Sequence, residues 1–307
     1  MILSFFKQKG FNIFIYLTIA WLVYYLSKND ILLIPKVYSY SFLFVSILFL
    51  ALGFAADMYA WSSMLKIHNI KAAFKIIIIS SGIGILGKYL PGKVWTVMGR
   101  AKVISDDSPV SVKEVMYISF ESQILMLWTG LMISLLGAVI SGLNLKYSLL
   151  IFVTLLIFSV IIFSNKYKVL VEKILLKLIN YSVVIPKRNL INKKIIIANF
   201  LPWICWLVGF YFLASSITAS MPSLAISFAV VISSTFGVIA LFAPGGLGVR
   251  EGILTGYLVL CGIDISLAVT ISVFSRLWFL AGELTVFIAA LILRISGTSS
   301  VSEKSTQ

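Results

Sequence analysis

A set of charged side chains stands inside or beside apolar stretches of this sequence and could bind a polar ligand there. Charged groups inside a membrane are costly unless they are paired or hydrated, so each is by default a candidate for function. Arginine binds phosphate through a fork of donors and lysine binds it as a point charge. The basic members could therefore hold an anionic headgroup, and the acidic members could balance or release it. The basic candidates are Lys88, Lys93, Arg100, Arg250 and Arg276, the acidic candidates are Glu121, Glu251 and Glu283, and Asp57 also lies within an apolar stretch.

The same residues have structural explanations that the sequence leaves open. Lysines near the end of a membrane helix often extend to the interface, which would account for Lys88 and Lys93. Ion pairs within the helix bundle, such as one between Glu121 and Arg276, would hold helices together without any ligand.

Two Pro-Gly sequences interrupt apolar stretches and predict broken helices. Proline removes a backbone donor, and glycine adopts backbone conformations that are closed to other residues. Broken backbone is tolerated in a bilayer only where protein or a water-filled cavity surrounds it, and exposed amides at a helix end attract anions. Beside the second break, Arg250 could alternatively pair with Glu251 and pin the loop. The break residues are Pro91 and Gly92 in the first sequence and Pro244, Gly245, Gly246 and Gly248 in the second.

Several classes of site are excluded by the sequence. Residues 82–88 match GxGxxG and GxxxxGK patterns, but Tyr89 stands where a phosphate-binding loop needs Ser or Thr, and no βαβ unit is predicted around them. His68 is the only histidine and is expected to be a loop residue, so a histidine triad or a histidine-rich metal site is excluded. Cys205 and Cys261 lie in apolar stretches, which is typical of core cysteines. We therefore expect no metal, no cofactor and no catalytic residue.

The composition predicts an all-α polytopic membrane protein. Of the 307 residues, 60% are hydrophobic and 12% are charged, whereas soluble domains have roughly 25% charged residues. The net charge of +14 is not a nucleic-acid signal, because it gathers in loops beside membrane segments. We expect about six full transmembrane helices plus two re-entrant or broken helical hairpins, whose arms are too short for a core about 30 Å thick. The expected spans cover residues 11–26, 40–61, 115–140, 147–164, 195–219 and 265–294, and the expected hairpins cover 76–101 and 224–261.

Shifting Pro91 onto Pro244, an offset of 153 residues, also places Gly84 on Gly237 and indicates an internal repeat. Secondary transporters use inverted repeats for alternating access. We expect a single integral membrane domain over residues 1–296, with repeat 1 at 40–164, repeat 2 at 195–294, and a disordered tail at 297–307.

The linker between the repeats sets the predicted topology. Residues 165–194 place apolar and basic side chains on opposite faces of a helix, which is typical of an amphipathic helix on a membrane surface. Its basic charge predicts a cytoplasmic location and contact with anionic lipids of the inner leaflet. Counting spans outward places both termini in the cytoplasm. The first broken hairpin then enters from the cytoplasmic side and the second from the outer side.

Two motifs resemble the signatures of a known family. Residues 88–93 (KYLPGK), followed by GRA at 99–101, resemble the first signature of the lysylphosphatidylglycerol synthase transmembrane-region family. Residues 243–252 (APGGLGVREG) resemble its second signature, and Arg276 matches the arginine of the following helix. The resemblance implies an eight-segment, flippase-like membrane domain with re-entrant elements. The soluble domain in which multidomain relatives synthesise lysyl-lipid is not expected here.

These features together predict a bacterial inner-membrane protein that moves a lipid between leaflets. The KYLPGK form resembles proteins associated with surface-glycan assembly, which favours an anionic or glycosylated lipid, either a phospholipid or a polyprenyl-phosphate-linked glycan. The sequence has no ATP-binding motif, so transport would run down a gradient or be coupled to an ion. Two alternatives are a non-transporting scaffold that binds glycan-assembly enzymes and a membrane glycosyltransferase, for which the first outer loop offers only Asp30 as an acidic residue.

Overall fold

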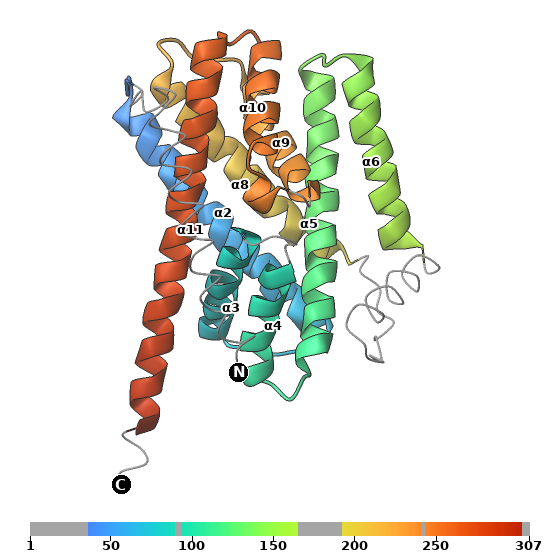
Figure 1. Ribbon diagram of the computed structural model, residues 1–307, viewed down its shortest axis with the longest axis vertical. Coiled ribbons are helices and arrows are strands. Elements are labelled where there is room, and N and C mark those ends of the chain that lie inside the picture. Colours follow the sequence, from blue (N-terminus) through green and yellow to red (C-terminus); the bar gives the residue numbers. More distant parts are fainter. Residues whose placement is uncertain (1–35, 90–93, 165–191, 241–242, 303–307) are drawn as a thin grey trace, which may run out of the picture.

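The computed structural model describes residues 36–89, 94–164, 192–240 and 243–302, and all regular structure in them is helical (Figure 1). Five of these helices are long and apolar enough to cross a membrane: α2 (Tyr40–Ile67), α5 (Val112–Ile140), α6 (Leu145–Phe163), α8 (Lys193–Ile217) and α11 (Ile265–Ser302). Even α6, with 19 residues, is about 28 Å long, close to the thickness of a hydrocarbon core. The predicted all-α polytopic fold is confirmed. The span expected at residues 11–26 lies outside the described residues.

Short helices form two further units, which we call the first and second broken hairpins. The first consists of α3 (Phe74–Leu86), the 3₁₀ turn η1 (Gly87–Tyr89) and α4 (Val94–Asp106), and the second of the turn η2 (Leu224–Ser227), α9 (Phe228–Ile239), η3 (Pro244–Gly246) and α10 (Val249–Leu260). At 13 and 12 residues, α3 and α9 are each about 20 Å long and too short to cross the core. Figure 1 shows the first broken hairpin in the lower half of the molecule and the second in the upper half, and η1 contacts η3 between them.

Polar side chains fix where the long helices begin. Ser39 accepts a hydrogen bond from the backbone N–H of Phe42 at 3.3 Å, at the start of α2. Asp264 accepts one from the backbone N–H of Ser266 at 2.8 Å, at the start of α11. Each bond satisfies an amide donor that a helix start leaves unpaired, so these helices begin where the apolar runs of the sequence begin.

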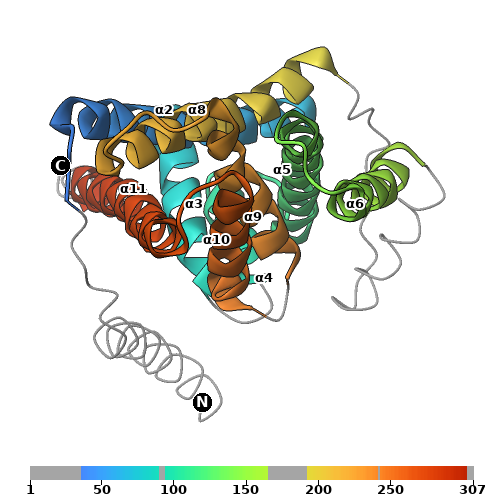
Figure 2. The same ribbon diagram turned by 90° about the horizontal axis from the view of Figure 1, so that it is seen from above.

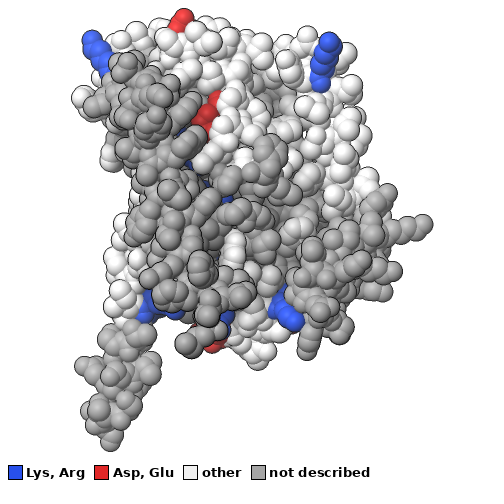
Figure 3. Space-filling view, in the orientation of Figure 1, with Lys and Arg blue, Asp and Glu red and all other residues white. Residues whose placement is uncertain are grey.

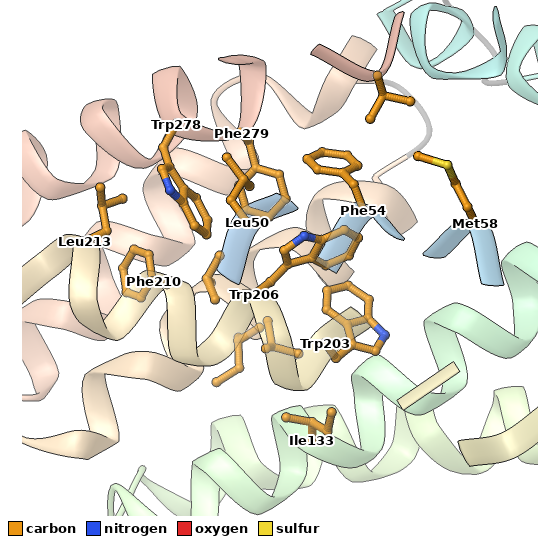
Figure 4. Close-up of a cluster of buried hydrophobic side chains, with 14 of the residues drawn as sticks. Leu50, Phe54, Met58, Ile133, Trp203, Trp206, Phe210, Leu213, Trp278 and Phe279 are labelled. Carbon is orange, nitrogen blue, oxygen red and sulfur yellow. The ribbon is translucent and has the colours of Figure 1, made fainter. Parts of the chain in front are cut away.

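The core is built around α2 and α8, which run side by side and pack against each other more extensively than any other pair of described helices (Figures 1 and 2). Trp206 of α8 meets the rings of Phe54 and Phe279 edge-on, with centroid separations of 5.5 and 5.4 Å (Figure 4). The indole also lies against Gly53 of α2, where an added Cβ would stand 2.2 Å from its Nε1. Phe54 lies in the same way against Gly282 of α11. Rings seated on glycines therefore hold α2, α8 and α11 close together.

Basic side chains gather at one end of the described structure, which we call the lysine-rich end. It is formed by the loops that join α2 to α3 and α4 to α5, at the bottom of Figure 1. The opposite end carries Lys36 and Lys146. In the space-filling view, charged atoms gather toward the two ends, and most of the described surface between them is uncharged (Figure 3). The lysines of the two loops and the helix ends beside them are Lys66, Lys71, Lys75, Lys102 and Lys113.

Candidate functional site

The second break is built on glycines with left-handed backbone. The φ angle is +59° at Gly245, +71° at Gly246 and +79° at Gly248, in the region that favours glycine. A Cβ on Gly246 would lie 3.0 Å from the carbonyl oxygen of Gly237 in α9, so the turn packs directly on the helix that precedes it. The N–H of Gly248 donates to Oε2 of Glu251 at 2.7 Å. These contacts fix the first turn of α10 relative to the break.

Five of the candidate residues meet where the two breaks touch, and we call this cluster the charged junction: Lys88, Arg250, Glu251, Arg276 and Glu283. Lys88 of η1 pairs with Glu283 of α11. Nη1 of Arg276 lies 3.6 Å from Oε1 of Glu251 and donates to the carbonyl oxygen of Gly245 at 2.9 Å. The junction therefore ties η1, η3, α10 and α11 together.

Two members of the charged junction are buried, and the other three are partly exposed, the side chain of Lys88 most of all at 36%. Glu283 is 3% exposed and Arg250 is 8% exposed. The guanidinium of Arg250 lies over the ring of Phe279, 4.3 Å from its centroid, an attraction between a cation and the face of an aromatic ring. Arg250 and Arg276 are also close enough to Lys88 to act on its charge. Pairing lowers the cost of burying these charges, and three basic groups against two acidic ones leave the cluster attractive to an anion.

Arg100 lies in a separate cluster within the lower half of the molecule. Its Nη2 donates to Oδ2 of Asp57 on α2 at 2.9 Å, and its guanidinium lies 5.5 Å from the centroid of a ring of Trp61. The Nε1–H of Trp61 in turn donates to the hydroxyl of Ser80 on α3 at 2.9 Å. Arg100 therefore ties the return arm of the first broken hairpin to α2, and its direct contacts do not place it in the charged junction.

Glu121 also lies apart from the charged junction. One carboxylate oxygen accepts a hydrogen bond from the hydroxyl of Tyr117 at 2.8 Å, and the other lies 3.4 Å from Nε2 of His68. The suggested pair of Glu121 with Arg276 is not what the structure shows, because each has other partners. His68 lies in the turn after α2, as expected of a loop residue, but its side chain is 2% exposed and contacts Glu121, which the sequence did not indicate.

Arg100 and Arg250 each pack on a glycine, Gly84 and Gly237 respectively. These glycines are 153 residues apart, the same separation as Pro91 and Pro244. A Cβ on Gly84 would lie 2.6 Å from Cγ of Arg100, and a Cβ on Gly237 would lie 3.2 Å from Cβ of Arg250. In each hairpin a glycine of the incoming helix thus leaves room for an arginine of the return helix.

Sequence reasoning selected the charges but missed their partners. The aromatic rings under Arg100 and Arg250 and the carboxylate partner of His68 had no local signal, because each lies on a different helix. Of the remaining candidates, Pro91, Gly92 and Lys93 lie outside the described residues. Within the described part of the chain, no cluster of three or more His, Cys, Asp and Glu side chains could hold a metal ion.

Comparison with known proteins identifies the family. The profile of the lysylphosphatidylglycerol synthase TM region matches residues 11–282. No significant match was found among curated proteins or among solved structures. The match spans both breaks and every residue of the charged junction except Glu283, which lies one residue beyond it. The chain therefore belongs to the lysylphosphatidylglycerol synthase transmembrane-region family.

Proposed function

We propose that this protein moves a lipid with an anionic or glycosylated headgroup between the leaflets of a bacterial inner membrane. Family membership indicates a membrane protein with a lipid-related function. The membrane region of the family is flippase-like and is not catalytic by itself, so the proposed role is transport and not chemistry. The headgroup enters the charged junction while the acyl chains stay in lipid.

The charged junction is the observation that carries this proposal. Buried charges in a membrane protein usually mark a polar pathway, and here they lie where two broken hairpins from opposite halves of the molecule touch. Arg250 and Arg276 offer guanidinium donors suited to phosphate. Glu251 already pairs with Arg276, and Glu283 already pairs with Lys88. An arriving headgroup therefore exchanges with existing partners and does not meet unpaired charge.

The distribution of lysines supports an orientation for this movement. Cytoplasmic loops of membrane proteins carry an excess of Lys and Arg, so we place the lysine-rich end in the cytoplasm. The first broken hairpin then enters from the cytoplasm and the second from the outside, as alternating access between inverted repeats requires. The described end of α11 also points toward the cytoplasmic side (Figure 1). With the span expected at residues 11–26, both termini are cytoplasmic.

A leaflet assay on reconstituted protein tests the proposal. Fluorescent lipids with zwitterionic, anionic and glycosylated headgroups are followed as they leave the outer leaflet of proteoliposomes containing wild type, Arg250→Ala or Arg276→Ala. A hydrogen bond to a charged group is worth about 1.5–3 kcal/mol, so each variant should move the preferred lipid about 10- to 100-fold more slowly. Arg294→Ala is the matched control, because Arg294 is an exposed arginine on the same helix as Arg276.

Equal flipping by all four proteins at equal reconstitution would reject the proposal. It would favour the scaffold alternative, in which the linker at 165–194, rather than the charged junction, binds anionic lipid and glycan-assembly enzymes. Residues 165–191 of that linker lie outside the described residues, and Lys193 and Lys194 begin α8. Deleting 167–181 while keeping the spans separates the two functions. Loss of partner capture with intact flipping would assign the linker a role of its own.

A further inference from the structure

The contact between His68 and Glu121 joins two ionisable groups whose nearest atoms are not satisfied by hydrogen bonds. Nε2 of His68 and Oε2 of Glu121 are 3.4 Å apart, within the range of an ion pair, but their geometry does not make a hydrogen bond. Neither ring nitrogen of His68 has a hydrogen-bond partner within the described structure, although the side chain is only 2% exposed. Buried polar atoms are normally satisfied, so this pair calls for an explanation.

Protonation changes the nature of this contact. A neutral imidazole beside a carboxylate gains little, whereas an imidazolium forms an ion pair that is strong inside a protein. The step breaks one O–H bond of a hydronium ion in the water at the lysine-rich end, forms one N–H bond on the ring, leaves a water molecule and moves one positive charge to the imidazole. Histidine is the side chain whose ordinary titration falls near neutral pH. Tyr117 holds the other carboxylate oxygen and keeps Glu121 oriented toward α2.

His68 lies in the turn between α2 and the first broken hairpin. It closes the C-terminal end of α2, and the next residue, Asn69, has a left-handed backbone with φ +58°. The N–H of Ile70 donates to the carbonyl oxygen of Leu65 at 3.0 Å, and α3 begins four residues later. The imidazole therefore contacts α5 in the turn where the chain leaves α2 for the first broken hairpin.

The hairpin is also attached to the same face of α2 at a second level. Asp57 and His68 are eleven residues apart, which is close to three helical turns, so they share a face. Asp57 binds Arg100 of the return arm. The end of α2 is thus connected to α3 by the chain and to α4 by the pair of Asp57 with Arg100.

The other charges around the pair come from the helices that pack on α2 and α5. Helix α9 carries no charged residue, and the only lysine of α6, Lys146, lies at the end of the molecule opposite the lysine-rich end. Arg100 is already paired with Asp57, and Lys102 is paired with Asp106. Besides the pair itself, the titratable and charged groups on the elements packed here are Tyr40, Asp57, Tyr59 and Lys66 on α2, Lys71 before α3, Lys75 on α3, Arg100, Lys102 and Asp106 on α4, Lys113, Glu114 and Tyr117 on α5, Lys193, Lys194, Cys205 and Tyr211 on α8, and Arg276, Glu283 and Arg294 on α11.

We propose that His68 and Glu121 form a proton-binding site that links proton uptake from the lysine-rich side to the position of the first broken hairpin. The proposed lipid movement is then coupled to protons, with the coupling site on α2 and α5 and the headgroup site at the charged junction. This coupling rests on the proposed function, but proton binding itself does not.

The proton site is tested directly, because the chain has one histidine. Protein labelled with ¹³C and ¹⁵N only in histidine, held in lipid nanodiscs, gives one set of imidazole signals that can be followed from about pH 5 to about pH 9. In wild type the signals should move between the two protonation forms, and Glu121→Gln should lower the proton affinity about tenfold, because it removes the opposite charge. Glu114→Gln, which changes the same residue type two turns away on α5, should leave the affinity as in wild type.

Coupling is tested in proteoliposomes with an imposed gradient of about one pH unit. Such a gradient supplies a factor of up to about ten for each proton carried, so wild type should flip lipid at different rates when the gradient is reversed. His68→Gln and Glu121→Gln should flip at rates that do not depend on its direction. Melting curves of both variants in nanodiscs exclude unfolding as the cause.

The outcomes separate the two proposals. Equal proton affinities in Glu121→Gln, Glu114→Gln and wild type would reject the proton site. A titrating histidine with equal gradient dependence in wild type and His68→Gln would reject the coupling. Lack of flipping by wild type under every gradient would reject the proposed function, and the histidine signals would still decide the proton site.

Discussion

Replacing Asp57 with Asn should destabilise the protein by leaving Arg100 charged and buried without its partner. The side chain of Arg100 is 10% exposed and that of Asp57 is 23% exposed. Removing one member of a buried ion pair costs about 3–5 kcal/mol. Because water can partly reach the position of Asp57, we expect the lower value, about 3 kcal/mol, which is about a hundredfold in the ratio of folded to unfolded protein.

The assay is reversible unfolding in mixed micelles by increasing fractions of denaturing detergent, followed by tryptophan fluorescence. Asp107→Asn is the control, because Asp107 is an exposed aspartate in the loop after α4. The double variant Asp57→Asn/Arg100→Gln carries no buried charge at this position and should recover most of the lost free energy of unfolding. If Asp57→Asn unfolds at the same fraction of denaturing detergent as wild type, the ion pair does not hold α4 to α2. The same conclusion follows if the double variant loses more free energy of unfolding than the single variant.

Three further predictions follow from the backbone and the helix ends. Gly248→Ala should lower the free energy of unfolding by about 1 kcal/mol, because a Cβ is strained at φ +79°. The control Gly252→Ala places its Cβ in open space on α10 and should be neutral or stabilising by up to about 1 kcal/mol. Unfolding by denaturing detergent compares the two variants. Gly53→Ala should lower the free energy of unfolding by about 1–3 kcal/mol, because its Cβ would stand 2.2 Å from the indole nitrogen of Trp206 on α8. The control Gly256→Ala, whose Cβ meets nothing within 4 Å, should not lower it. Equal Tm values for the two variants would contradict the close packing at Gly53. Hydrogen bonds from the hydroxyl and the amide of Ser266 lower the pKa of Asp264. The ionised carboxylate therefore stabilises the start of α11 above the usual aspartate pKa, and this contribution is lost as pH falls through the lowered pKa. The Tm difference between wild type and Asp264→Ala should shrink on acidification, and a constant difference would refute the role of the charge.

Much of the fold could be predicted from the sequence because the relevant signals are local. Apolar runs mark the spans, and Pro-Gly sequences mark the places where helices stop. The left-handed angles at Gly245 and Gly248 are of the kind that only glycine adopts readily. The five described long helices each overlap an expected span, because length and hydropathy are properties of a single segment.

The pairing of the charges could not be predicted, because it depends on which helices become neighbours. Arg100 and Arg250 occupy similar places in the two broken hairpins and each lies against an aromatic ring, but the ring and the carboxylate beside Arg100 are on α2 and the ring beside Arg250 is on α11. His68 follows an apolar helix in a basic loop, and nothing in that stretch shows that Glu121, more than fifty residues away, will lie beside it. Contacts between distant segments carry these distinctions, and a single sequence does not record them.

The pairing of α2 with α8 has a consequence for how the protein is made. Lys193, the first residue of α8, is synthesised 126 residues after Ile67, the last residue of α2. At about 5–20 residues per second, the earlier helix waits roughly 6 to 25 seconds in the bilayer before its main neighbour arrives. During that interval the surface at Gly53, which Trp206 of α8 covers in the finished fold, has no partner from α8. The first half of the molecule therefore cannot complete its own core, and its final packing comes late in biogenesis.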